Sequence, residues 1–222
     1  MVDKILEYIC IFLALIVVLP VHEFAHAFVA VKFGDNTPKL NGRYNLNPLS
    51  HFDVSGLICF LFTGFGWAKP VPVNPYNFTK YKAGCFWVSV AGVIANILLA
   101  FLIYPLFILS IRIPQFGYFT VVLKTTLIYI FSMSIGFSVF NLIPVYPLDG
   151  FRAIDCFAKK RGKVYRFLRE KGYYVLLVLL LLGVFGDAIG VPQLDVLGYA
   201  LNYVSGLIQY PISAFWGLFF YG

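Results

Sequence analysis

The sequence predicts an all-α polytopic membrane protein, with about five transmembrane helices, a three-helix core and a small membrane-associated β or re-entrant insert. Three observations support this prediction. Hydrophobic residues make up 60% of the 222 residues and charged residues only 12%, whereas soluble domains carry about 25% charged residues. Five apolar stretches are long enough to cross a bilayer, and most basic residues gather in two of the segments between them. The composition excludes soluble, disordered, collagen-like and disulfide-rich classes.

The five stretches match or exceed the length of roughly 20 residues that a helix needs to cross a hydrocarbon core. They cover about residues 5–33, 84–111, 121–147, 173–191 and 194–221. The first three, with the insert at about 38–80, form a predicted core domain over residues 1–155. Residues 156–222 add a basic cytoplasmic loop and two further transmembrane helices. The first stretch has no A-x-A cleavage pattern, so we expect it to be retained as a helix.

The insert is predicted to combine β structure with a segment that enters the membrane without crossing it. Residues 57–67 are apolar but too short to span, and they contain two glycines. Asn41-Gly42 is a hairpin turn signal. Residues 68–74 are expected to be extended, because two prolines alternate with valines there.

The basic residues predict the orientation of the chain. Fourteen of the 17 Lys and Arg residues lie within residues 32–84 and 150–172, and cytoplasmic loops carry the excess of such residues. Both segments are therefore expected in the cytoplasm, with the N-terminus outside the cell membrane and the C-terminus inside. This distribution accounts for the net charge of +7 without a nucleic-acid partner. Residues 159–171, the most basic stretch, could also bind anionic lipid or an acidic partner.

Two of the three histidines lie close together in the first apolar stretch, in the sequence His22-Glu23-Phe24-Ala25-His26. On a helix, the i, i+4 spacing puts both imidazoles on one face, where each can offer a nitrogen to one zinc ion. Glu23 can then serve as general base toward a water at the metal. Polar side chains are costly in mid-membrane, so a chance match is disfavoured. Haem is a poor alternative, because its axial ligands must approach opposite faces of the ring.

A hydrolytic zinc site uses three protein ligands and a water, so a third ligand is expected. Asp149 is the main candidate, because it follows two prolines that break the third apolar stretch. In the predicted orientation the first and third stretches run in the same direction, so Asp149 reaches a depth similar to that of His22 and His26. His51, in a polar loop with Asp53, is the other candidate, and both are expected to support the site without binding metal.

The four cysteines are scattered along the chain and form no CxxC pair. They are therefore predicted to be packing residues, without a disulfide or a thiolate metal site. They are Cys10, Cys59, Cys85 and Cys156.

These motifs together resemble the site-2 protease family of intramembrane zinc metalloproteases, in particular its compact bacterial members. The segment from His22 to Ala27, with Gly34-Asp35, resembles the first family motif, and the segment from Asn141 to Gly150 resembles the second. Further similarities lie at Gly42-Arg43, Leu46-Asn47-Pro48-Leu49, His51, Asp53 and residues 66–75. The resemblance covers about residues 20–155.

The resemblance implies a catalytic core in which His22, His26 and Asp149 hold one Zn²⁺ per chain and Glu23 activates water. It implies zinc metalloendopeptidase activity toward transmembrane segments of other proteins, in regulated intramembrane proteolysis. A regulatory membrane partner would be compatible with that role.

Three further residues are candidates for contact with substrate. Asn96 ends a stretch similar to a family element, although Val93 stands where proline is usual. Asn96 could bind the substrate backbone or the oxyanion, or it could join two helices by a hydrogen bond. Val71 and Val73 keep N–H groups that their proline neighbours lack, and could pair with an unwound substrate by strand addition.

Two other functions remain open. A catalytically inactive relative would bind membrane helices, although the intact Glu23 disfavours it. A metal transporter would carry ionisable residues along a path across several helices, whereas here they cluster at one depth.

Overall fold

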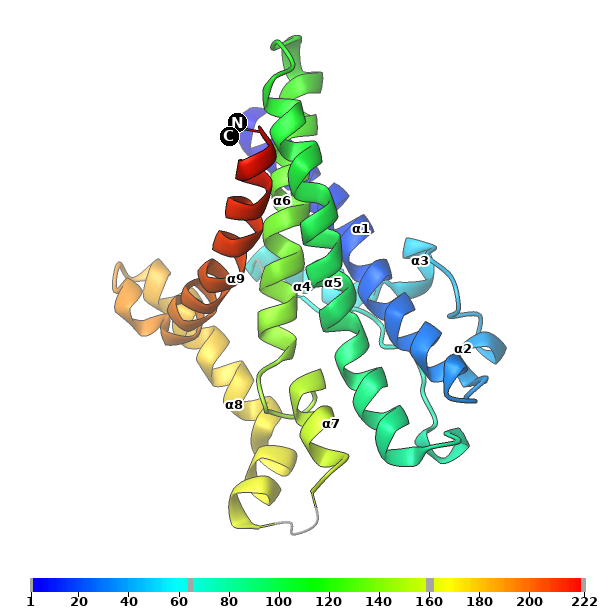
Figure 1. Cartoon of the computed structure of the whole chain (residues 1–222). Coiled ribbons are helices and arrows are strands. Elements are labelled where there is room, and N and C mark those ends of the chain that lie inside the picture. Colours follow the sequence, from blue (N-terminus) through cyan, green and yellow to red (C-terminus); the bar gives the residue numbers. More distant parts are fainter. Residues whose placement is uncertain (1, 64–65, 159–161, 221–222) are drawn as a thin grey trace.

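The computed structural model describes residues 2–63, 66–158 and 162–220, which form an almost entirely helical chain (Figure 1). Three long helices make the central bundle: α1 (Val2–Lys32), α5 (Tyr81–Ile111) and α6 (Gly117–Asn141). The other elements are α2 (Thr37–Leu40), α3 (Pro48–His51), α4 (Val54–Thr63), η1 (Pro75–Asn77), α7 (Asp149–Asp155), α8 (Lys163–Ala188), η2 (Pro192–Leu194) and α9 (Val196–Phe220).

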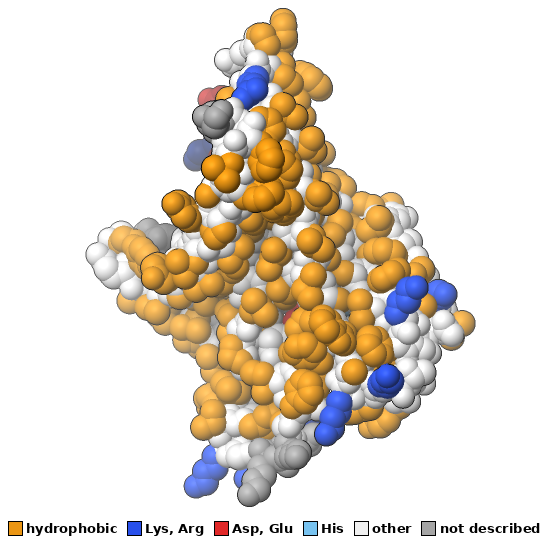
Figure 2. Space-filling model, in the orientation of Figure 1, with side chains coloured by type: hydrophobic (Ala, Val, Ile, Leu, Met, Phe, Trp, Pro, Cys, Tyr) orange, Lys and Arg blue, Asp and Glu red, His pale blue; other side chains and the backbone are white. Residues whose placement is uncertain are grey.

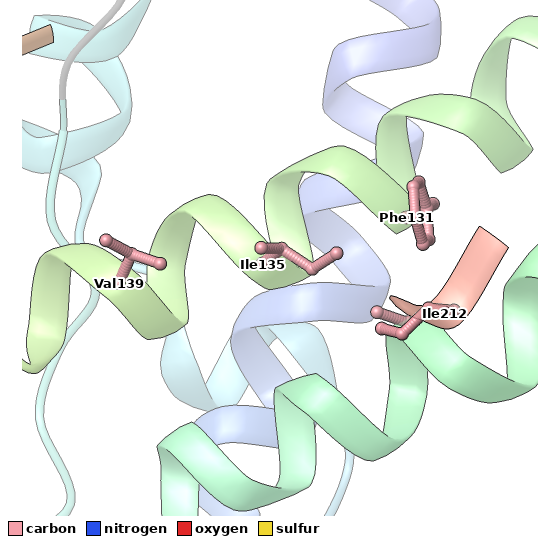
Figure 3. Close-up of a cluster of buried hydrophobic side chains, with 5 residues drawn as sticks. Phe131, Ile135, Val139 and Ile212 are labelled. Carbon is pink, nitrogen blue, oxygen red and sulfur yellow. The ribbon is translucent and has the colours of Figure 1, made fainter. Parts of the chain in front are cut away.

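The bundle helices pack against one another in all three pairings. Small residues at the contacts, such as Ala14 on α1 and Ala100 on α5, are fully buried and let the backbones approach closely. A cluster of buried side chains then joins α5, α6 and α9, as Figure 3 shows. It consists of Ala100, Phe131, Ile135, Val139 and Ile212.

Within the part of the chain that the structure describes, three helices are long and apolar enough to cross a membrane: Asp3–Lys32, Tyr81–Ile111 and Gly117–Asn141. The prediction of an all-α membrane protein is thus confirmed, and so is the presence of helices at the first three predicted spans. Hydrophobic side chains cover much of the face seen in Figure 2, and the Lys and Arg side chains lie around its periphery, at the top, along the right edge and at the bottom.

The prediction of five spans is not supported beyond these three helices. Residues 173–191 and 194–221 do fall on two further helices, α8 and α9, but α8 begins at Lys163, inside the basic segment. Figure 1 shows that α8 leads away from the bundle and that α9 returns along α6 to the end where α1 begins. There the Arg112 guanidinium donates a hydrogen bond to the Phe220 carbonyl oxygen over 2.8 Å.

This arrangement also differs from the predicted placement of the chain ends. Five crossings would put the beginning of α1 and the end of α9 at opposite ends of the bundle. The structure puts them at the same end (Figure 1), because α8 and α9 together run only once from one end of the bundle to the other.

The prediction of β structure in the insert is wrong for the residues that the structure describes, which contain one isolated bridge, Phe52 to Ala68, and no strand. The turn signal at Asn41-Gly42 ends α2 and makes no hairpin, with Gly42 at a φ of +64°. Residues 68–74, the segment predicted to be extended, form no helix and no strand, because Pro70 and Pro72 lack N–H donors and side chains bind several of the other backbone groups. A ladder with a neighbouring strand therefore does not form.

The predicted re-entrant segment, residues 57–67, overlaps helix α4, Val54–Thr63. Residues 64–65 of that segment lie outside the described residues, as do residues 159–161 of the predicted lipid-binding stretch. The division into a core over 1–155 and a second part over 156–222 stays a prediction.

Candidate metal centre

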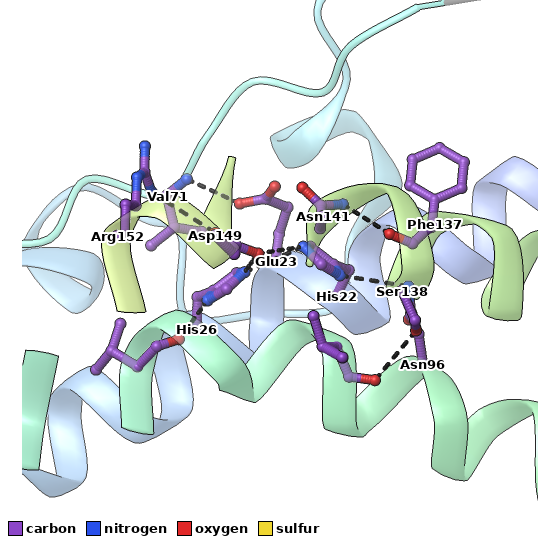
Figure 4. Close-up of polar contacts among 12 residues, drawn as sticks. His22, Glu23, His26, Val71, Asn96, Phe137, Ser138, Asn141, Asp149 and Arg152 are labelled. Atoms are coloured by element: carbon purple, nitrogen blue, oxygen red, sulfur yellow. Dashed lines mark hydrogen bonds and ion pairs between the residues drawn. The ribbon is translucent and has the colours of Figure 1, made fainter. Parts of the chain in front are cut away.

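The structure brings His22, His26 and Asp149 together, with one ligand atom from each within 4.8 Å of the others. His22 and His26 lie one turn apart on α1, and Asp149 is the first residue of α7. Asp149 Oδ2 lies 3.2 Å from His22 Nε2 and 3.1 Å from His26 Nε2, and the two Nε2 atoms are 3.1 Å apart. Figure 4 shows the three side chains converging from the two helices.

This triangle of atoms fits a zinc ion. Three ligands of a tetrahedral zinc with bonds of about 2.0–2.1 Å lie roughly 3.3–3.4 Å apart, close to the separations found here. The donor set of two imidazoles and a carboxylate is one that zinc accepts. All three residues are buried, and Asp149 Oδ2 receives no hydrogen bond among the described residues. A buried carboxylate oxygen without a donor is costly unless a cation neutralises it.

The nitrogen of each ring that faces away from the triangle also has a partner. His26 Nδ1 lies 2.6 Å from the Val88 carbonyl oxygen, and His22 Nδ1 lies 3.3 Å from the Asn96 side-chain nitrogen. Both partners belong to α5. When Nε2 binds a metal, Nδ1 carries the proton and donates it, to the Val88 carbonyl in His26 and, in His22, to the Asn96 amide oxygen, which has no other partner among the described residues and would turn toward the ring. Such contacts fix the ring orientation and leave Nε2 directed at the metal position.

Gly92 on α5 makes this approach possible. A Cβ atom at Gly92 would lie 2.5 Å from His26 Nε2 and 2.5 Å from His22 Cε1. The adjacent turn is held in place, because Ser138 on α6 donates a hydrogen bond to the Val93 carbonyl oxygen over 3.1 Å. Any side chain at position 92 would therefore displace the ligands.

Asp149 reaches the two histidines because the chain turns sharply after α6. The segment between α6 and α7 contains Pro144 and Pro147, which prevent the helix from continuing. A Cβ atom at Gly150 would collide with the Leu142 carbonyl oxygen, so glycine allows α7 to fold back on the end of α6. The other oxygen of Asp149 lies 4.0 Å from the Arg152 guanidinium.

Glu23 contacts the extended segment of the insert. Its Oε2 accepts a hydrogen bond of 2.9 Å from the Val71 N–H, as Figure 4 shows. The N–H of Val71, which we expected to be available for a substrate strand, is therefore already in use. No hydrogen bond of Val73 N–H was found among the described residues, so its pairing with a substrate stays a prediction.

The other candidate residues lie beside the cluster or away from it. Asn96 is completely buried behind His22, a position that suits orientation of the ring more directly than contact with substrate. His51 lies outside the cluster, with Nε2 at 2.8 Å from the Asn45 carbonyl oxygen. Asp53 accepts hydrogen bonds from Ser55 and the Gly56 N–H at the start of α4. Neither His51 nor Asp53 is found in contact with a residue of the cluster.

Sequence reasoning missed three parts of this site. The Val88 carbonyl is a backbone group, which leaves no signal in the residue type. The Val71 N–H was expected to bind a substrate, and its partner in the structure, Glu23, was not predicted. Gly92 lies in the stretch that ends at Asn96, and its closeness to both histidines follows from the packing of α5 on α1, which the residue type does not show.

Several curated proteins are similar to this chain. "Putative zinc metalloprotease YwhC" of Bacillus subtilis is 41% identical over 145 residues, which cover 64% of this chain and 66% of that protein. "Putative zinc metalloprotease Rip2" of Mycobacterium tuberculosis H37Rv is 30% identical over 171 residues, covering 75% and 63% respectively. Rip2 of Mycolicibacterium smegmatis is 27% identical over 236 residues, covering 97% and 85%. The chain thus spans about two thirds of the length of the first two relatives. No family model and no solved structure matches it.

Proposed function

The chain belongs to the site-2 protease-like family of zinc metalloproteases, and from this premise we propose that it is an intramembrane zinc endopeptidase. It would hydrolyse peptide bonds within or next to transmembrane segments of other membrane proteins. One observation carries the proposal: the cluster of His22, His26 and Asp149 is built on and beside helices long enough to span a membrane, with Glu23 next to it in the chain.

The residues of the cluster have separable roles in the proposed reaction. His22, His26 and Asp149 would hold the zinc ion, which when bound polarises the substrate carbonyl and lowers the pKa of a water. Glu23 takes a proton from the attacking water and passes it to the leaving nitrogen. Asn96 and the Val88 carbonyl keep the two imidazoles in orientation.

A helical substrate must unwind before its carbonyl can be attacked. The extended segment 68–74 lies beside Glu23 and would offer backbone groups of Val73 to the unwound chain. The site would open at the end of the bundle that carries α7 and the basic segment, which the excess of Lys and Arg assigns to the cytoplasm. The beginning of α1 would then lie outside the cell membrane.

The wider roles follow from the same proposal. Cleavage of membrane proteins would serve regulated intramembrane proteolysis, in which a regulatory membrane partner would control access of the substrate. The basic residues at the start of α8 would bind anionic lipid.

Zinc content and cleavage test the proposal together. Zinc per chain would be measured in detergent-purified wild type and in His22→Ala, His26→Ala, Asp149→Ala and Glu23→Gln, with His51→Ala as a buried histidine outside the cluster. We expect about one zinc in wild type, Glu23→Gln and His51→Ala, and loss in the three ligand variants. Cleavage of fluorogenic transmembrane peptides in liposomes should occur in wild type and disappear in Glu23→Gln.

Other outcomes would favour the other functions. Zinc binding without Glu23-dependent cleavage of any peptide would indicate an inactive relative that binds membrane helices. Zinc flux into protein-containing vesicles would indicate a transporter. Zinc retained by Asp149→Ala and lost by His51→Ala would overturn the ligand set.

A further inference from the structure

Arg43 is a buried cation in the insert. It belongs neither to the metal cluster nor to the residues with a role in the proposed reaction. It follows Gly42 just after α2, and only 7% of the surface of the whole residue is exposed. Its own N–H donates to the Pro38 carbonyl oxygen over 2.8 Å, which fixes its backbone against α2. Among the described residues, no carboxylate was found within 4.0 Å of its guanidinium. A buried charge without a counter-ion is costly and calls for a specific role.

The guanidinium of Arg43 binds the extended segment that covers Glu23. Its Nη2 lies 3.3 Å from the Lys69 carbonyl oxygen and 3.4 Å from the Pro70 carbonyl oxygen, and donates to both. Both contacts come from one nitrogen, whose two N–H bonds are fixed in the plane of the guanidinium, whereas the ammonium of a lysine rotates freely on a flexible stem.

The Pro70 carbonyl and the Val71 N–H belong to one peptide unit. That peptide is trans, so its C=O and N–H point in opposite directions. Arg43 binds its oxygen and Glu23 Oε2 accepts from its N–H at 2.9 Å. One amide plane therefore lies between a buried cation and the carboxylate beside the metal cluster.

The chemistry of the segment singles out this peptide. Pro70 and Pro72 have no N–H, so the N–H of Val71 is the backbone donor of these three residues. A cation at the carbonyl end polarises the amide and strengthens its N–H as a donor, and a low local dielectric enlarges the effect. The carboxylate of Glu23, which would otherwise sample several rotamers, is then held in one orientation.

We propose that Arg43 is a positioning residue for the reaction at Glu23, acting through the peptide that joins Pro70 and Val71. Arg43 holds the carbonyl, the peptide presents its N–H, and the N–H holds the Glu23 carboxylate beside His22 and His26. This inference rests on the proposed function for the role of Glu23 in proton transfer. The bridge from Arg43 to Glu23 can be tested without any turnover.

The first test reads the bridge directly. Proline precedes valine at four places in the chain, before Val21, Val71, Val73 and Val145. Protein with ¹³C-carbonyl proline and ¹⁵N-valine therefore gives four amide signals in a spectrum selected for these pairs. Substitution of Val71 identifies which of the four signals belongs to Val71.

In Arg43→Gln and in Glu23→Gln we expect the Val71 amide proton to move upfield, while the Val73 and Val145 signals stay in place. Arg112→Gln is the matched control, since Arg112 also donates to a backbone carbonyl but at the far end of the bundle. A Val71 signal that does not respond to Arg43→Gln would overturn the proposal.

The second test reads the consequence for the reaction. We expect Arg43→Gln to lower kcat by about tenfold with little change in KM, because the base is misplaced while the substrate still binds. Arg43→Lys should restore part of the loss, and Arg112→Gln should retain wild-type cleavage. Zinc per chain should stay at the wild-type level in Arg43→Gln, because the ligands are not altered.

A double-mutant cycle then shows whether Arg43 acts through the peptide. Val71→Pro removes the N–H, and Val71→Ala, which keeps it, measures what loss of the side chain costs by itself. If the bridge operates, adding Arg43→Gln to Val71→Pro causes little further loss of kcat. Additive losses would overturn the proposal, and so would an equal loss in Arg112→Gln. Absence of Glu23-dependent cleavage in wild type would reject the proposed function and the catalytic role of Arg43, whereas the labelled amide would still decide whether the bridge exists.

Discussion

His26 Nδ1 lies 2.6 Å from the carbonyl oxygen of Val88, so a backbone group of α5 orients a side chain of α1. The geometry of the candidate metal centre therefore depends on how closely these two helices approach each other, and substitutions at their contact should act on metal binding.

The contact at Gly92 gives the first prediction. Gly92→Ala would place a methyl group 2.5 Å from His26 Nε2, so α5 must move or the rings must rotate. We expect loss of zinc and a destabilisation of about 1–3 kcal/mol, typical of overpacking. Zinc analysis and thermal unfolding in detergent measure both effects. Gly136→Ala on α6 is the matched control, because its Cβ would have no atom within 4 Å; wild-type zinc binding in Gly92→Ala would contradict the prediction.

Asn96 allows two roles to be separated. If it orients His22, Asn96→Ala should weaken zinc binding by roughly 10- to 100-fold, as measured by competition with a chelating dye. Ser134→Ala, which removes another fully buried polar group from the bundle, should keep wild-type affinity. Unchanged zinc affinity with loss of cleavage would instead support the oxyanion role expected from the sequence.

Asp35 should make stability depend on pH. It lies just after α1, where burial alone would raise its pKa. Hydrogen bonds from Thr37, Asn77 and the Asn74 N–H outweigh burial and hold the pKa of the Asp35 carboxyl below its ordinary value. The unfolded chain therefore binds the proton more readily, and the stabilisation is present above the ordinary pKa of about 3.9 and is lost as pH falls through the lower folded value.

Asp35→Asn measures this contribution. The substitution replaces one of the two carboxylate oxygens, each of which accepts a hydrogen bond from a backbone N–H, with an NH₂ group that cannot accept one. We therefore expect the Tm to fall by roughly 5 °C at neutral pH. The difference from wild type should begin to shrink below about pH 4, where the unfolded wild-type chain takes up the proton, and should be smallest once the folded carboxyl is also protonated. Thermal unfolding across a pH series provides the measurement, and a difference that stays constant down to pH 3 would argue against the assignment.

Metal removal should lower stability through the same cluster. Zinc that binds only the folded chain stabilises it by about 4 kcal/mol when its free concentration is 1,000 times the Kd. A chelator should therefore lower the Tm of wild type, with no effect on Asp149→Ala. Equal sensitivity of the two proteins to the chelator would show that the metal binds elsewhere.

Cysteine labelling tests the placement of the chain ends. Four exposed positions serve for labelling. Lys4→Cys near the beginning of α1 and Leu218→Cys near the end of α9 mark one end of the bundle, where Figure 1 shows these helix ends together; Lys82→Cys at the beginning of α5 and Arg169→Cys in the first turns of α8 mark the other. In sealed vesicles a membrane-impermeant maleimide should label the first pair from one side and the second pair from the other, against a background set by the native cysteines. Labelling of Leu218→Cys together with Lys82→Cys would restore the five-span topology expected from the sequence.

The parts of the molecule that the sequence predicted well depend on local periodicity or on order along the chain. The spacing of His22 and His26 places them on one helix face without any tertiary information. Asp149 could be inferred because the first and third helices run in the same direction. The length of each apolar stretch predicted α1, α5 and α6.

The parts that could not be predicted depend on tertiary contacts between segments that are distant in sequence. The turn signal before Arg43 suited a hairpin, but Arg43, Asp35 and Glu23 bind backbone groups of the extended segment that a partner strand would have used. The hydropathy of residues 173–221 predicted helices and did not predict that α8 departs from the bundle before α9 returns to it. The bridge through Val71 joins three segments that are distant in sequence.

The ligands of the candidate centre also set an order of events during synthesis of the protein. His22 and His26 enter the membrane with the first helix, whereas Asp149 follows only after α5 and α6. A nascent chain that ends before Asp149 has just two of the three ligands and lacks the turn of α7 that presents the third. The proposed hydrolytic centre therefore stays incomplete until the chain has passed Asp149, and it assembles only once its own bundle has formed around it.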